Sequence, residues 1–257
     1  MMWEKTEFTF GDCLFWQMGP LQLWVRRIDG EWQTAIERVP ESAPFVSAQR
    51  CDPPDGASWT RWAAHPDDVT FQLRPIMPDR PVIVRPESAF SFPPQSDLMF
   101  YVSIPVAIQM CTGSVAEVPL MEVPSVVLSN SWFGEPVHGQ LCYALKTTAR
   151  RTLDDLRVSP HLVACPIHIQ NRSGTVLAFE RLCLQTQHMA IFQDQRRLWT
   201  NQVGIQHGAG SAQDTLEFSQ GAPDVSWQAN CLTEARLPVR KTLLQKSFFN
   251  IKSFMRM

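Results

Sequence analysis

Residues that could carry out nucleophilic chemistry lie within one short stretch of the chain, SNSWFGEPVHGQLCY at residues 129–143. Ser131 and Cys142 offer a hydroxyl and a thiol, His138 could act as the general base, and Glu135 could orient the imidazole. Such a constellation would be typical of a hydrolase-like enzyme. It requires that the base contact the nucleophile.

The spacing within this stretch favours a structural turn instead. His138 and Cys142 are four positions apart, which would bring them together on a helix but does not do so in an extended or turning chain. Gly134 and Pro136 suit a turn that leads into a strand at residues 140–147. We therefore predict no catalytic residue here, and the hydrolase remains the alternative.

Metal and phosphate sites leave no recognisable pattern in the sequence. Cys165 and His168 are three positions apart in an expected strand, so their side chains would point to opposite faces. No pair of cysteines has zinc-type spacing, and no glycine-rich phosphate loop is present. We predict neither a metal nor a cofactor, and we interpret the seven cysteines as reduced thiols, most of them in the core.

Tryptophan is unusually frequent, with nine copies in the chain. Six of them fall in the first 62 residues, at positions 3, 16, 24, 32, 59 and 62. Exposed aromatic rings on a sheet could stack on sugars, which makes an intracellular carbohydrate-binding module a further alternative. Core packing across strands accounts for them more simply, and we expect Trp132 and Phe133 to cover the end of the core in the same way.

The composition describes an ordinary folded protein. Hydrophobic residues make up 44% of the 257 residues and charged residues 19%, which excludes disorder as the main state. A net charge of −2 argues against nucleic-acid binding. The N-terminus lacks the positive charge and apolar run of a signal peptide, and the window 98–111 is too short and too polar to cross a bilayer. We expect a cytoplasmic location, or one peripheral to the inner face of the membrane.

Alternating apolar residues and turn signals predict an all-β protein. The clearest element is a hairpin of residues 21–28 and 31–36 around Asp29-Gly30. Further strands are expected at 69–73, 81–84, 98–110, 125–129, 140–147, 162–170, 175–184, 189–192 and 197–203. We predict antiparallel sheets packed as one or two sandwich-like modules, residues 1–158 and 159–235, which could form a single domain.

The C-terminal segment, RKTLLQKSFFNIKSFMRM, has a different pattern. From Lys241 onward, apolar residues recur at spacings of four, three and four, which predicts an amphipathic helix in a basic tail at 236–257. Its apolar surface is wider than docking on a sheet needs, and basic side chains flank it. The residues expected to bind a partner are Leu244, Phe248, Phe249, Ile251, Lys252, Phe254 and Met255.

One family resembles the central part of the chain. The segments MPDRPVIVRPESAF, FYVSIPVAI, SVVLSNSWFGEPVHGQLCYALKTTAR and CPIHIQNRSGTVLAFERLCL are similar to domain of unknown function 432, over roughly residues 70–200. The resemblance implies a mostly β protein and supplies no catalytic residue. Members of that family are often encoded beside small-conductance mechanosensitive channel proteins, so the resemblance also implies a membrane channel as partner.

These observations favour a non-enzymatic binding or regulatory protein that associates with a protein partner, such as a mechanosensitive channel, or with the membrane surface. The two alternatives are a hydrolase-like enzyme that uses the 129–142 region and an intracellular carbohydrate-binding module.

Overall fold

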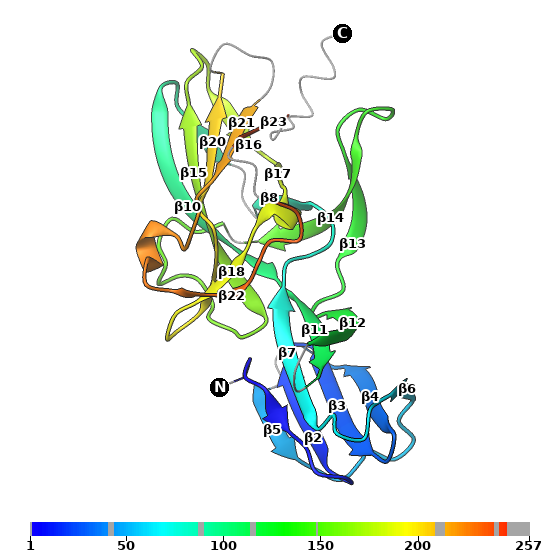
Figure 1. Ribbon diagram of the computed structural model, residues 1–257. Helices are drawn as coiled ribbons and strands as arrows, with labels where there is room; N and C mark the ends of the chain where they lie inside the picture. The colour runs from blue at the N-terminus through cyan, green and yellow to red at the C-terminus, as the bar shows by residue number, and fades with distance from the viewer. Residues whose placement is uncertain are drawn as a thin grey trace. The chain divides into compact units, whose positions relative to one another are not determined.

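The computed structural model describes residues 2–40, 44–86, 90–113, 117–147, 149–208, 214–238 and 242–245. It confirms an all-β protein whose helical content, in these ranges, is two single turns of 3₁₀ helix, η1 (Thr186–His188) and η2 (Asp224–Ser226) (Figure 1). The chain forms two compact units: unit 1 comprises residues 1–76, 106–126 and 159–161, and unit 2 comprises 77–105, 127–158 and 162–257. The predicted modules, 1–158 and 159–235, follow the chain, whereas these units interleave.

Unit 1 contains a five-stranded and a four-stranded antiparallel sheet. The first has the order β5-β2-β3-β4-β6 and the second β1-β7-β11-β12. The strands are β1 (Thr6–Glu7), β2 (Cys13–Met18), β3 (Leu21–Ile28), β4 (Glu31–Arg38), β5 (Val46–Arg50), β6 (Trp59–Ala63), β7 (Thr70–Ile76), β11 (Ala107–Thr112) and β12 (Val118–Pro124). The predicted hairpin is confirmed as β3 and β4. Phe71 on β7 packs against Trp16 on β2 and Trp32 on β4, so the two sheets share an aromatic core.

Unit 2 contains an eight-stranded sheet in which β15 (Leu162–Asn171) is central. β15 pairs antiparallel with β10 (Ser96–Pro105) and parallel with β19 (Leu198–Thr200) and β20 (Val203–His207). The other members are β18 (Ile191–Gln193), β21 (Asp214–Phe218), β22 (Asn230–Thr233) and β23 (Thr242–Gln245). The prediction of antiparallel sheets therefore holds for most pairings but misses the parallel ones.

A second sheet of unit 2 has the order β13-β14-β8-β17, and a two-stranded one joins β9 and β16. These strands are β8 (Val82–Pro86), β9 (Phe90–Phe92), β13 (Ser129–Phe133), β14 (Gln140–Thr147), β16 (Leu177–Phe179) and β17 (Leu182–Leu184). The rings of Phe90, Phe92, Phe100 and Phe179 form an aromatic cluster with centroid separations of 4.8–6.5 Å. The strand expected at 98–110 is split into β10 and β11 beside Pro105, which has no amide hydrogen to donate to a ladder.

The predicted C-terminal helix is wrong where the structure describes it. Residues 242–245 form β23, which pairs antiparallel with β21 through Thr215 opposite Leu244. The backbone N–H and C=O groups on the edge of β21 form hydrogen bonds in this ladder. The helical spacing of a few apolar residues is a weaker preference than this pairing. Residues 246–257, which include the remaining predicted partner-binding positions, lie outside the described residues.

A buried arginine holds a loop of unit 1 against its sheet. Arg27 on β3 is fully buried, and its guanidinium donates to the carbonyls of Asp68 (2.9 Å), His65 (2.9 Å) and Glu31 (3.0 Å), as well as to that of Ile28. Two carbonyls of loop 64–69, those of His65 and Asp68, thereby accept from a side chain of the sheet. A buried cation with several acceptors is stabilising only while every bond is made.

We predict that Arg27→Met lowers the free energy of unfolding by about 3–5 kcal/mol, because four part-buried carbonyls around the buried guanidinium lose their donor at once. Arg26→Met is the matched control, because Arg26 lies on the other face of β3 and is only half-buried. It should cost about 1 kcal/mol or less. Urea denaturation of both variants measures the difference, and equal losses would show that Arg27 has no special role.

Candidate functional site

The stretch that contains Ser131, His138 and Cys142 forms a hairpin, which holds these three residues at separate positions. Ser131 on β13 is directly opposite Cys142 on β14, whereas His138 lies in the exposed tip between the strands. Among the described residues, no hydrogen bond or ion pair joins His138 to another side chain. The hydrolase hypothesis requires a contact between His138 and a hydroxyl or thiol, and the structure does not provide it.

Cys142 is inaccessible as a nucleophile. Its side chain is fully buried in a cluster with Ile83, Phe133 and Cys183, and the two sulphurs are 3.9 Å apart. A hydrogen bond from Cys183 lowers the pKa of Cys142, while the same contact and burial raise the pKa of Cys183. Because a thiolate reacts only where a substrate can reach it, the buried Cys142 side chain is not the accessible nucleophile that the hydrolase hypothesis requires.

The two aromatic residues of the hairpin have opposite roles. Phe133 is 5% exposed and packs in the cluster with Cys142, whereas Trp132 is 47% exposed. The expectation that Trp132 covers the core is therefore wrong. Successive side chains on a strand point to opposite faces, so only one of two adjacent aromatic residues can be buried by the same core.

The tip of the hairpin holds Trp132 in a defined position. The indole nitrogen of Trp132 donates to the carbonyl oxygen of Glu135 at 3.0 Å, and the amide of Gly139 donates to the same oxygen at 2.7 Å. A Cβ at Gly139 would lie 2.3 Å from the indole nitrogen, so only glycine fits beneath the ring. The tip therefore presents an aromatic side chain that is already ordered.

Other side chains extend the exposed face of the hairpin. Leu141 is directly opposite Trp132 and is 44% exposed, and Tyr143 is directly opposite Asn130. Arg80 lies over the Tyr143 ring at 5.5 Å and donates to the side-chain oxygen of Asn130 at 3.0 Å. We call Arg80, Asn130, Trp132, Leu141 and Tyr143 the hairpin face.

The part of the hairpin nearest its tip extends beyond its neighbour strand. β8 pairs with Tyr143–Thr147 of β14, and not with Gln140–Cys142. β13 is at the edge of its sheet and pairs, among the described strands, with β14 alone. Figure 1 shows the tip of β13 and β14 reaching past the other strands of their sheet.

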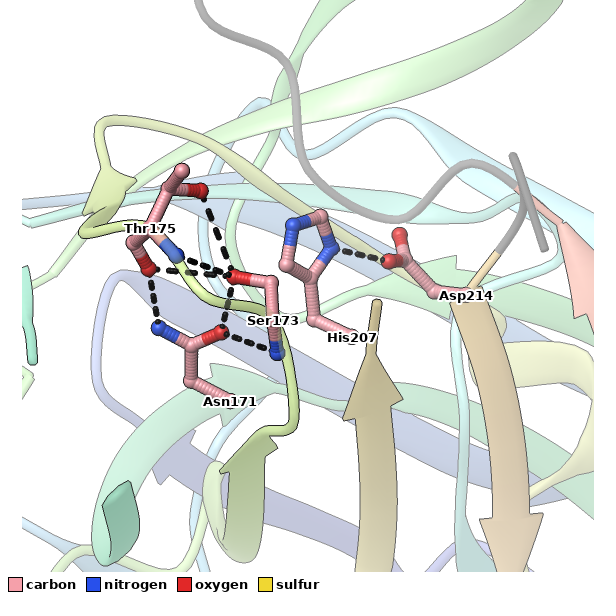
Figure 2. A network of polar contacts seen from close by, with 5 residues as sticks. All are labelled: Asn171, Ser173, Thr175, His207 and Asp214. Carbon is pink, nitrogen blue, oxygen red and sulfur yellow. Dashed lines mark hydrogen bonds and ion pairs between the residues drawn. The ribbon is translucent and has the colours of Figure 1, made fainter. Parts of the chain in front are cut away.

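A second polar cluster was not predicted from the sequence. Asn171, at the end of β15, accepts from the Ser173 hydroxyl (2.7 Å) and donates to the Thr175 carbonyl (2.9 Å), and nearby the His207 Nδ1 atom is 2.6 Å from the Asp214 carboxylate (Figure 2). Serine, histidine and aspartate are the residue types of a hydrolase triad. In the sequence, this region shows only the turn-forming residues 171–174 between two expected strands and a single histidine at position 207. Neither feature reveals that these residues lie close together.

The contacts of Ser173 assign it a structural role. Its hydroxyl lies 2.7 Å from the Asn171 side-chain oxygen and accepts from the Thr175 amide at 3.2 Å. Among the contacts drawn in Figure 2, none joins the Ser173 hydroxyl to His207. A Cβ at Gly208 would lie 2.5 Å from the Ser173 Cβ atom, so the end of β20 needs glycine to approach this turn. Because the single hydroxyl hydrogen is used within the turn, Ser173 is not prepared for attack.

The carbohydrate hypothesis finds little support on unit 1. Trp3, Trp16 and Trp32 are buried, and Trp24, Trp59 and Trp62 are half-buried. Trp24 and Trp59 share one face of the five-stranded sheet, but the Arg26 guanidinium covers Trp59 at 4.1 Å. Half of these six rings are therefore buried, and the other three are only partly accessible.

Neither metal clusters nor spanning helices are found in the part of the chain that the structure describes. No group of three or more His, Cys, Asp or Glu side chains there could hold an ion. No helix in that part is both long and apolar enough to span a lipid bilayer.

The family was identified by comparison with known proteins. The model of a protein family of unknown function, DUF432, matches residues 2–256. The chain belongs to the DUF432 family. The match confirms the resemblance found in the central segments and extends it to nearly the whole DUF432 chain. Neither the curated proteins nor the solved structures contain a match.

The hairpin predicts a contrast between adjacent substitutions. Phe133→Ala should lower the free energy of unfolding by about 3–5 kcal/mol because it empties a buried cluster. Trp132→Ala should cost about 1 kcal/mol, since the ring is half exposed, and His138→Ala should cost less. Thermal or urea unfolding of the three variants measures this order, and a larger loss for Trp132→Ala would reverse the assignment of the two faces.

Proposed function

We propose that this protein is a non-enzymatic binding protein that engages a protein partner through the hairpin face. The observation that carries the proposal is the directly paired Trp132 and Leu141, which are 47% and 44% exposed. Leaving large apolar side chains in water is unfavourable, and contiguous exposed apolar surface is characteristic of interaction sites.

The composition of the hairpin face supports a protein as the ligand. Tryptophan, tyrosine and arginine are the residues most enriched among those that dominate binding energy, and Trp132, Tyr143 and Arg80 lie on this face. The hydrogen bond from Trp132 to Glu135 orders the ring before binding. A preorganised anchor loses less side-chain entropy when it is buried in an interface.

The edge of β13 supports a more specific form of recognition. Its sequence, SNSWF, contains neither charge nor proline, the features with which proteins commonly protect an edge strand. An extended segment of the partner could therefore add to β13 as a further strand and place apolar side chains beside Trp132. In this proposal the hairpin, and not the C-terminal segment, is the main contact.

We predict that a photo-crosslinking amino acid at position 137 or 141 captures one common protein in native cells, whereas the same probe at position 227 does not. Val137 and Leu141 belong to the hairpin, and Trp227 is an exposed apolar residue elsewhere on unit 2, with an exposed fraction between those of Leu141 and Val137. Mass spectrometry identifies the captured protein. Different captured proteins at 137 and 141, or the same ones at 227, would contradict the proposal.

The purified partner then provides the quantitative test. Trp132→Ser should weaken binding by roughly 30-fold, the effect of losing a dominant anchor. Gly139→Ala should weaken binding as well, because its Cβ would collide with the Trp132 indole and with the carbonyl oxygens of Phe133 and Glu135, which disturbs the hairpin tip and the ring that it orders. Trp227→Ser is the matched control that should bind as the unaltered protein does. Calorimetric titration measures all three, and unaltered affinity of the Trp132 variant would refute the proposal.

A further inference from the structure

Two cysteines of unit 1 lie face to face on neighbouring strands. Cys13 begins β2 and Cys51 directly follows β5, next to the paired residues Leu14 and Arg50. The Cys51 amide donates to the Cys13 carbonyl at 3.0 Å, and the two sulphurs are 3.7 Å apart. This is a contact between unbonded sulphurs, which a change in side-chain torsion could convert into a bond of about 2 Å.

Access from solvent distinguishes this pair from the other close pair of thiols. Cys142 and Cys183 are 3.9 Å apart, but both are fully buried. Cys13 is 4% exposed, while Cys51 is half-buried and can be reached by a small molecule. The two pairs have similar sulphur separations and differ in solvent exposure, so the buried pair is an internal control for the effect of access on oxidation.

We propose that Cys13 and Cys51 are a redox-active dithiol, which a small-molecule disulfide such as oxidised glutathione converts into an intrachain disulfide. The Cys51 thiolate attacks one sulphur of the small disulfide, forming a mixed disulfide and releasing one small thiolate, which takes up the proton that Cys51 lost. The Cys13 thiolate then attacks the Cys51 sulphur, forming the Cys13–Cys51 bond and releasing the second small thiolate, which takes up the proton from Cys13. Two protein thiols are oxidised, and one small disulfide is reduced to two thiols.

The environment of the pair determines the order of the two steps. Burial, together with the neighbouring Cys51, raises the pKa of the Cys13 thiol to about 12. Cys13 is therefore a poor first nucleophile. The Cys51 thiol no longer raises the pKa of Cys13 once Cys51 carries the small thiol. Cys13 is then held beside the sulphur that it must attack.

The bond would act on an edge strand with few buried contacts. β5 pairs with β2 at one edge of the five-stranded sheet, and a register shift between Phe15 and Gln17 interrupts the ladder. Ala48, within β5, has a positive φ of 46°, and none of the strand's side chains is fully buried. Oxidation would fasten this strand to the sheet by a covalent bond and constrain the unfolded chain.

The test uses the full chain, incubated in native buffer with excess oxidised glutathione and then quenched with an alkylating reagent. Intact mass and peptide mapping should find a Cys13–Cys51 bridge, with Cys142 and Cys183 unoxidised until the protein is unfolded. The bridged form should unfold at a temperature roughly 5 °C or more higher. Cys13→Ser should trap glutathione on Cys51, and Cys51→Ser should abolish both products.

Cys142→Ser is the matched control and should form the Cys13–Cys51 bridge as the unaltered protein does. The proposal is overturned if the native protein accumulates only the mixed disulfide at Cys51, or if the bridge appears only after unfolding. It is also overturned if Cys142 and Cys183 oxidise as fast as Cys13 and Cys51, because exposure would then not select the pair.

Discussion

The burial of Phe133 is the constraint on which the hairpin face depends. Phe133 packs with Ile83, Cys142 and Cys183, which sets the orientation of β13 relative to its sheet. Because side chains alternate along a strand, the residue before Phe133 must point to the other face. Trp132 and its partner Leu141 are thus exposed as a consequence of a packing interaction to which they do not belong, and the tip then orders the indole through Glu135 and Gly139.

In unit 1, the position of loop 64–69 depends on one buried side chain, that of Arg27. The inward face of β3 carries Leu21, Leu23, Val25 and Arg27 at successive alternate positions, all of them buried. The alternating pattern places the arginine correctly but does not explain why a cation can be buried there. Loop carbonyls that come from residues up to 41 positions away make that possible.

The sequence predicts local features well, but it predicts contacts between residues far apart in the chain poorly. The β3–β4 hairpin follows from the Asp29-Gly30 turn between alternating strands, because turn chemistry and period are both local. Which of Trp132 and Phe133 faces the core depends on Ile83 and Cys183, and the pairing of Asn171 with His207 depends on the parallel ladder between β15 and β20. The helix expected from Lys241 onward failed at 242–245 because an edge strand, β21, was available to pair with it.

Hydroxyl-radical footprinting of the free protein tests the central claim most directly, because it measures the exposure of Trp132 and Phe133 side by side. The account predicts that Trp132 is oxidised rapidly, at a rate comparable with that of exposed Trp227 once both are scaled to accessible area, whereas Phe133 is protected. Adding the identified partner should protect Trp132 and leave Trp227 unchanged. Rapid oxidation of Phe133 together with a protected Trp132 in the free protein would contradict the orientation of the hairpin and the binding function inferred from it.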